Sequence, residues 1–224
     1  MSFRQQQSVR HLLKGGPLMS VNRVLLPALC GLAMLFATSV VNASILINEL
    51  HYDNAGTDAG EFIEVITTAG EDPNDITVSL YNGADSELYG FSPDTFNLAA
   101  DFVNHGILTD GNRYFSRSFP VNGLQNGAPD GIAVDLSGTV QEFLSYEGVI
   151  AAAGDGPAVG FGPSTDIGVE EGSSTPLGSS LQRFGSLWVV TTGTNTQGAI
   201  NIPEPASFAL LLLGLAGIAT RRRL

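Results

Sequence analysis

The chain has 224 residues, with ten lysines and arginines against 22 acids and a formal net charge of −12. Residues 44–202 hold 21 of those acids and only three arginines, with no lysine, which leaves a charge of −18 on this stretch. Such a charge repels nucleic-acid phosphate unless metal ions intervene, so it disfavours the third possible role, nucleic-acid binding in the matrix. Phe, Tyr, Ile, Leu and Val recur at strand-like intervals, which excludes a disordered acidic chain and favours an exported folded domain.

The N-terminus has the pattern of an export signal. Met19 is a candidate true start, because Arg23 then supplies the basic region, residues 24–41 the apolar core and Ala43 a small residue for cleavage before Ser44. We therefore predict a signal peptide over residues 1–43, read by the Sec machinery. A retained membrane anchor is the alternative, but the switch to a strand pattern at Ser44 favours cleavage.

The single cysteine, Cys30, lies inside this signal. The exported domain therefore has no disulfide and no thiol chemistry. Leu29 and Pro27 precede the cysteine in place of the small and apolar residues of a lipidation site, which argues against a lipid anchor.

Residues 45–53 alternate as a β-strand, after which a turn rich in Asn, Asp and Gly leads into a second strand over Phe62–Thr68. The alternation predicts one face with Leu46, Leu50 and Tyr52. It predicts that Ile47, Glu49, His51 and Asp53 share the other face. In the second strand, Ile63 and Val65 share a face.

Further short strands follow at intervals of roughly eight to twelve residues, separated by Gly, Pro, Asn and Asp turns, a spacing typical of a sandwich or barrel. We predict them at residues 76–81, 88–91, 112–119, 132–136, 139–146, 180–184 and 187–191. Residues 92–105 fit either a loop or a short strand, and the glycine-rich residues 148–178 carry few strand signals. We expect no helix of useful length between residues 44 and 202.

The last residues form a separate tail. Pro203-Glu204-Pro205 precedes an apolar run over residues 206–219, which is short for a full membrane span, and Arg221, Arg222 and Arg223 follow it. This combination resembles the PEP-CTERM sorting signal of Gram-negative bacteria. The resemblance implies a short transmembrane helix over 202–224, transient anchoring in the inner membrane, processing by an exosortase, and delivery to the cell surface, outer membrane or extracellular matrix. A plain C-terminal anchor is the alternative.

Residues 44–201 resemble the bacterial secreted form of the lamin-tail domain. The segments that carry the resemblance are INELHYDN (47–54), GTD (56–58), GEFIE (60–64), LYNG (80–83), QNGAPDG (125–131), FLSYEG (143–148), STDIGV (164–169), SLQ (180–182) and Trp188. The resemblance implies an all-β, immunoglobulin-like β-sandwich between the signal helix and the tail. It also implies an accessory role beside extracellular nucleases or phosphoesterases, although this chain leaves no residues for a catalytic domain.

Four carboxylates near the first turn are candidate metal ligands: Glu49, Asp53, Asp58 and Glu61. Carboxylate oxygens are the ligands that Ca²⁺ prefers, although the spacing matches no EF-hand loop. The sequence favours the other interpretation, in which these acids cap and shape the turn. We therefore expect no cofactor, with Ca²⁺ as the alternative.

We expect no catalytic residues, because no serine elbow, zinc motif or phosphate loop is present. The expected role is binding or structural, with extracellular polysaccharide or a surface protein as partner. The alternative is a small Ca²⁺-dependent extracellular hydrolase of the first hairpin, with His51 as base. Trp188 is expected to fill the core, and a sugar-stacking surface is its alternative role.

Overall fold

The computed structural model describes residues 45–90, 95–127 and 129–201. The predicted signal peptide, its cleavage site at Ala43 and Ser44, and the sorting residues of the tail lie outside them. Within these ranges no helix has the length and apolar character that a membrane crossing requires.

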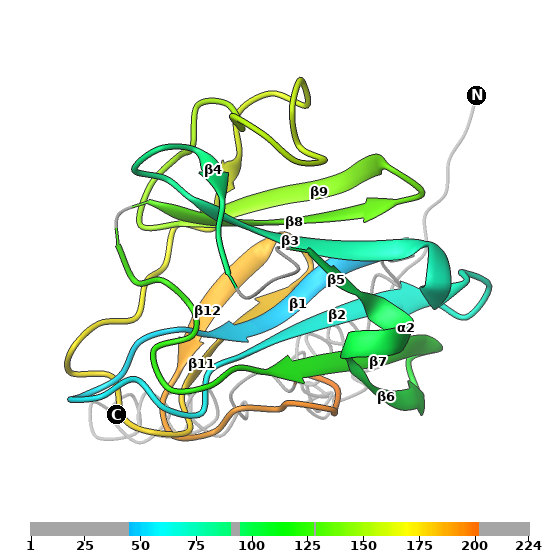
Figure 1. The fold of residues 1–224 in the computed structure, drawn as a ribbon. Helices are drawn as coiled ribbons and strands as arrows, with labels where there is room; N and C mark the ends of the chain where they lie inside the picture. Colours follow the sequence, from blue (N-terminus) through cyan, green and yellow to red (C-terminus); the bar gives the residue numbers. More distant parts are fainter. Residues whose placement is uncertain (1–44, 91–94, 128, 202–224) are drawn as a thin grey trace, which may run out of the picture. The chain divides into compact units, whose positions relative to one another are not determined.

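Two β-sheets form the domain (Figure 1). The first sheet has the strand order β12-β11-β1-β2-β7-β6 and the second β10-β9-β8-β3-β4, with β5 also paired to β3. All the pairings are antiparallel except that of β10 with β9. The first sheet comprises β1 (Ile45–His51), β2 (Phe62–Thr68), β6 (Val103–Ile107), β7 (Asn112–Ser118), β11 (Ser180–Phe184) and β12 (Leu187–Thr191).

The second sheet comprises β3 (Ile76–Asn82), β4 (Glu87–Leu88), β5 (Thr95–Asn97), β8 (Asp130–Leu136), β9 (Thr139–Tyr146) and β10 (Thr165–Asp166). A 3₁₀ turn, η1 (Pro73–Asp75), and one helical turn, α2 (Leu98–Asp101), are the helical elements of the described part. The predicted all-β sandwich is therefore confirmed. The strands predicted at 180–184 and 187–191 have the observed bounds. The strand predicted to start at residue 88 is only the two-residue β4. Residues 92–105, which fit a loop or a short strand, hold β5, α2 and the start of β6, and β10 was not predicted.

The main core lies between the sheets and is continuous from one to the other. It joins Ile63, Val65 and Phe115 of the first sheet to Val78, Leu80 and Val134 of the second. Tyr52 and Tyr146 stack across it with ring centroids 4.1 Å apart, a contact worth about 0.5–1.5 kcal/mol beyond burial. Trp188 belongs to this core, as predicted.

The faces predicted for the first strand are wrong at its start. Ile45 and Ile47 point into the core together with Leu50, and Leu46 packs on the outer face against Ile66. The cause is a β-bulge at Asn48: Ile47 pairs with Val65, but Glu49 already pairs with Glu64. The extra residue reverses the alternation, which a strict period of two cannot anticipate.

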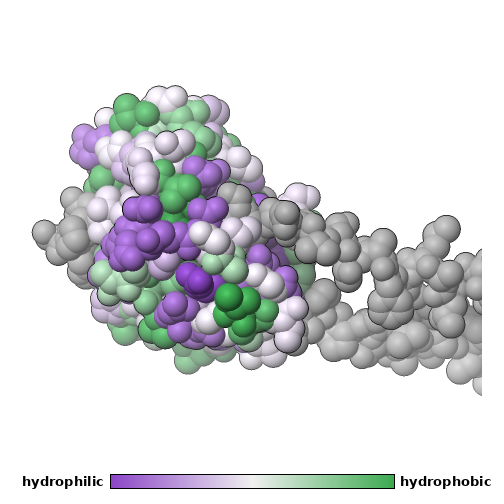
Figure 2. Space-filling view, turned by 90° about the vertical axis from the view of Figure 1, so that its right-hand side faces the viewer, coloured by the Kyte–Doolittle hydropathy of each residue, from purple (hydrophilic) through white to green (hydrophobic). Residues whose placement is uncertain are grey.

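The glycine-rich region covers the outer face of the second sheet. Ile150, Ala153 and Ala158 pack there against Tyr81 and Phe143. Gly156 has φ +67°, and a Cβ there would lie 2.7 Å from the Tyr81 hydroxyl, so the close approach requires glycine. Polar and apolar side chains alternate in small groups over the face drawn in Figure 2.

Candidate functional site

The β1–β2 hairpin holds a group of buried acids. Glu49, Glu61 and Glu64 are fully buried, and Glu49 lies directly opposite Glu64 in the pairing of the two strands. A buried carboxylate is costly unless donors surround it. Each of these three has several donors, and most of the donors come from loops far away in the sequence.

Glu49 accepts hydrogen bonds from the Ser180 hydroxyl (2.6 Å), from Gln182 (3.2 Å) and from both the backbone N–H (2.8 Å) and hydroxyl (2.7 Å) of Thr196. Glu64 accepts from the Asn48 amide (2.7 Å) and the Gly198 N–H (2.6 Å). The two acids therefore fasten the segment that follows β12.

Glu61 and His51 fasten two other loops. The backbone N–H groups of Gly123 and Leu124 donate to Glu61 at 2.8 and 3.0 Å. His51 Nδ1 donates to Glu171 at 2.8 Å, which leaves Nε2 to accept from the Asn54 amide at 2.9 Å. His51 is 1% exposed and both ring nitrogens are occupied, an arrangement typical of a structural histidine rather than a solvent-accessible base.

Asp53 and Asp58 lie together at the turn. Asp58 accepts from the Asn54 N–H (3.2 Å) and the Asn126 amide (3.1 Å). Burial and the neighbouring Asp58 raise the pKa of Asp53. Of the four predicted metal ligands, Asp53 and Asp58 thus lie together, whereas Glu49 and Glu61 accept hydrogen bonds from other loops.

A metal-binding group of three or more His, Cys, Asp or Glu side chains does not occur among residues 45–90, 95–127 and 129–201. The capping role considered for the turn is observed at Asp58, which accepts the N–H of Asn54. Ca²⁺ binding at the hairpin stays a prediction.

Burial is the largest influence on the pKa values of these hairpin acids. It raises the pKa of Glu64 to about 8, against the opposing hydrogen bonds of Gly198 and Asn48. Burial also raises the pKa of Glu49 and of Glu61, and hydrogen bonds partly offset it. For His51, burial lowers the pKa, but the hydrogen bond and charge of Glu171 outweigh it and the net direction is upward.

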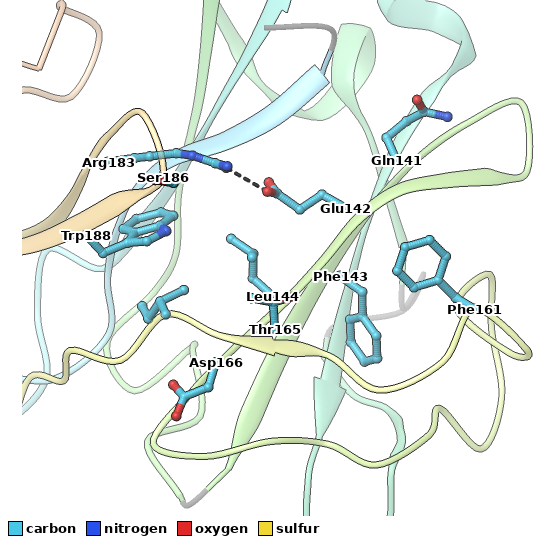
Figure 3. A pocket seen from close by; sticks show the side chains of 11 residues that line it. Gln141, Glu142, Phe143, Leu144, Phe161, Thr165, Asp166, Arg183, Ser186 and Trp188 are labelled. Atoms are coloured by element: carbon cyan, nitrogen blue, oxygen red, sulfur yellow. Dashed lines mark hydrogen bonds and ion pairs between the residues drawn. The ribbon is translucent and has the colours of Figure 1, made fainter. Parts of the chain in front are cut away.

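A pocket of about 350 Å³ opens at the edge where β9 and β10 of one sheet meet β11 and β12 of the other (Figure 3). Its lining combines rings, an ion pair and polar side chains from Gln141, Glu142, Phe143, Leu144, Phe161, Thr165, Asp166, Ile167, Arg183, Ser186 and Trp188. Such a mixture of apolar walls and a few polar groups is typical of ligand sites.

An ion pair closes one end of the pocket. Arg183 Nη1 donates to Glu142 at 2.7 Å and to the Ile47 carbonyl at 3.1 Å, while the Ile47 N–H donates to the other Glu142 oxygen at 2.9 Å. The pair thus joins the bulge of β1 to the second sheet. The Arg183 guanidinium also lies 5.8 Å from the centre of the Trp188 ring.

Sequence reasoning identified Trp188 but missed the rest of the pocket. Phe161 is 49% exposed in a loop without a strand pattern, and it lies across the pocket from Trp188 in Figure 3. An aromatic residue in a glycine-rich loop was the available signal. Glu142 and Arg183 are 41 residues apart, so their pairing could not be foreseen.

The profile of the PEP-CTERM protein-sorting motif matches residues 201–223. This match confirms the predicted sorting tail. The chain is an exported protein that an exosortase recognises and sorts at the membrane toward the cell surface. No curated protein and no solved structure matches the chain. The lamin-tail resemblance therefore stays a prediction.

Proposed function

We propose that this exported β-sandwich is a non-catalytic binding module of the cell surface or extracellular matrix, and that the pocket of Figure 3 takes a short neutral stretch of extracellular polysaccharide. The observation that carries the proposal is the pocket lining, in which the exposed ring of Phe161 stands with Gln141, Asp166 and Ser186, and the largely buried Trp188 forms the opposite wall. Aromatic faces suit sugar rings, and amide, carboxylate and hydroxyl groups suit their hydroxyls.

The charge of the domain argues for a neutral ligand. Residues 44–202 contain three arginines and 21 acids, and one of these arginines, Arg183, is already paired with Glu142. An acidic polysaccharide or a nucleic acid would meet net repulsion. The accessory role implied by the lamin-tail resemblance agrees with this proposal.

The proposal that the module is non-catalytic is supported by the hydrogen bonds of the hairpin acids and of His51. Glu49 and Glu61 accept main-chain N–H groups, and His51 is enclosed by protein partners. These groups are therefore engaged in holding loops. Hydrolysis of a phosphodiester by the purified protein that disappears in His51→Ala would overturn this part of the proposal and favour the Ca²⁺-dependent hydrolase.

The chain's single tryptophan makes the binding test direct, because Trp188 lines the pocket. Titration with neutral hexasaccharides of defined linkage is expected to change its fluorescence. Phe161→Ala should weaken binding about tenfold, the factor that corresponds to about 1.4 kcal/mol.

The matched control is Val159→Ala, since Val159 is 56% exposed in the same loop and does not line the pocket. Equal affinity of Phe161→Ala and the parent protein would contradict the assignment of the pocket. A preference for acidic over neutral oligosaccharides would contradict the assignment of the ligand.

A further inference from the structure

The last ten described residues, 192–201, lie along the outer face of the first sheet. Figure 1 shows them in orange beside this sheet, and Gln197 donates to the hydroxyls of Ser116 and Ser118 on β7 at 3.1 and 3.2 Å. Ile200 packs against the small outer cluster of Ile66 and Tyr114.

Two acids of the hairpin hold this segment. The backbone N–H of Thr196 donates to Glu49, and that of Gly198 donates to Glu64. A side chain at Gly198 would meet His105 at 2.7 Å, so the backbone approaches the sheet as closely as only glycine allows. Both acids are fully buried, so an acid that lost these hydrogen bonds would be left with unpaired oxygens away from water.

Asn201 closes the segment. Its amide donates to the carbonyls of Asn48 and Arg183, both at 3.0 Å, and its oxygen accepts from the Asn48 amide at 3.3 Å. Asn201 is also the first residue that the sorting-motif profile matches. The anchored end of the domain and the start of the sorting motif are therefore the same residue.

Only a few residues therefore separate the anchored end of the domain from the Pro-Glu-Pro sequence of the sorting motif. Pro203 lies two residues beyond Asn201 in the sequence, and two residues span at most about 7 Å. An enzyme that recognises the motif must therefore work close to the surface of the folded sandwich, at a point that the fold determines.

We propose that Glu49, Glu64 and Asn201 are positioning residues for exosortase sorting. They fasten residues 192–201 to the sheet, so that the enzyme meets the motif at one place on a folded domain. They also protect the segment that links domain and tail from other proteases. A merely structural role would lower stability without changing sorting.

The test uses the full chain, produced in a host that carries its exosortase. Processing is followed by pulse-chase, and the C-terminus of the processed chains is read by intact mass spectrometry. The variants are Asn201→Ala and the double variant Glu49→Gln/Glu64→Gln. Glu170→Gln is the matched control, because Glu170 is an exposed acid outside residues 192–201.

We expect processing of the two segment variants to slow about threefold or more, as positioning is lost. Their C-termini should spread into residues 192–201, whereas the parent and Glu170→Gln give one C-terminus. In detergent, limited proteolysis within 192–201 should accelerate about tenfold, the factor that corresponds to about 1.4 kcal/mol of opening.

A second control separates positioning from stability. Gly156→Ala destabilises the opposite face of the molecule, far from the segment, and its melting temperature is measured beside those of the other variants. Slower processing confined to the segment variants supports the proposal. Processing that falls equally in Gly156→Ala, or that is unchanged in variants whose segment is cleaved faster, overturns it.

Discussion

The carboxyl group of Glu64 should make the stability of the domain depend on pH in an unusual direction. Burial raises its pKa in the folded state to about 8 from the ordinary value of 4.5. Between these two values the folded chain holds a proton that the unfolded chain has lost. The free energy of unfolding therefore decreases as pH rises, whereas stability supplied by a salt-bridged acid would increase.

The magnitude follows from the linkage between proton uptake and stability. One proton taken up on folding changes the free energy of unfolding by about 1.4 kcal/mol per pH unit, so from pH 5.5 to 7.5 the Glu64 contribution falls by about 2–3 kcal/mol. Other buried acids with raised pKa values, including Asp130 at about 6, add to the total slope. The contribution of Glu64 must therefore be read as a difference between variants.

Glu64→Gln supplies that difference. Its amide cannot titrate, and it loses one of the two accepted hydrogen bonds, a constant cost of about 1 kcal/mol that does not vary with pH. Guanidinium denaturation of residues 44–201 at several pH values, followed by the fluorescence of Trp188, measures the slope. We expect the slope of Glu64→Gln to be smaller than that of the parent chain by up to about 1.4 kcal/mol per pH unit.

Parallel slopes in Glu64→Gln and the parent chain would refute this reasoning. They would mean that the N–H groups of Asn48 and Gly198 keep Glu64 ionised in the folded state. Glu170→Gln removes an exposed acid and controls for the change in net charge.

Three further outcomes are expected. Arg183→Met should destabilise the domain by about 2 kcal/mol at pH 8 and by less at pH 5. The reason is that the half-buried Glu142 then lacks its partner and can lose its charge only by binding a proton. Equal losses of stability in denaturant melts at both pH values would contradict this. Gly156→Ala should cost about 1–3 kcal/mol through the clash with Tyr81, seen as a lower melting temperature; an unchanged value would show that the loop moves aside freely. The melting temperature in millimolar Ca²⁺ decides between the predicted metal site and the capping role: a rise supports the metal site, whereas an unchanged value supports capping, in which main-chain donors already occupy two of the four carboxylates.

The strands were predictable because their signal is local. Alternating apolar residues and Asn, Asp and Gly turns located β3, β8, β9, β11 and β12. The bulge at Asn48 was not predictable, since nothing in the residues around it marks the extra position, and it reversed the faces of Leu46 and Ile47. The tail was predictable because a short motif, an apolar run and terminal arginines form one recognisable pattern.

The role of the hairpin acids could not be read from the sequence, because their partners are distant. Glu49 meets Thr196 at a separation of 147 residues, and Glu64 meets Gly198 at 134. The four candidate carboxylates are close in sequence, which is why the sequence predicted that they share one ion. In the structure they bind different loops. A local sequence pattern predicts the strand to which a residue belongs, but it does not predict which distant loop will pack over that residue.

The loops that cover the hairpin are themselves short of apolar residues. A segment such as residues 192–201 can bury little hydrophobic surface, so it needs specific hydrogen bonds to stay on the sheet. A neutral apolar residue in place of Glu49 or Glu64 would satisfy the strand pattern yet leave the returning N–H groups unpaired. The acids on the outer face of β1 and β2 are thus explained by what they hold, and the segment they hold leads directly to the sorting motif.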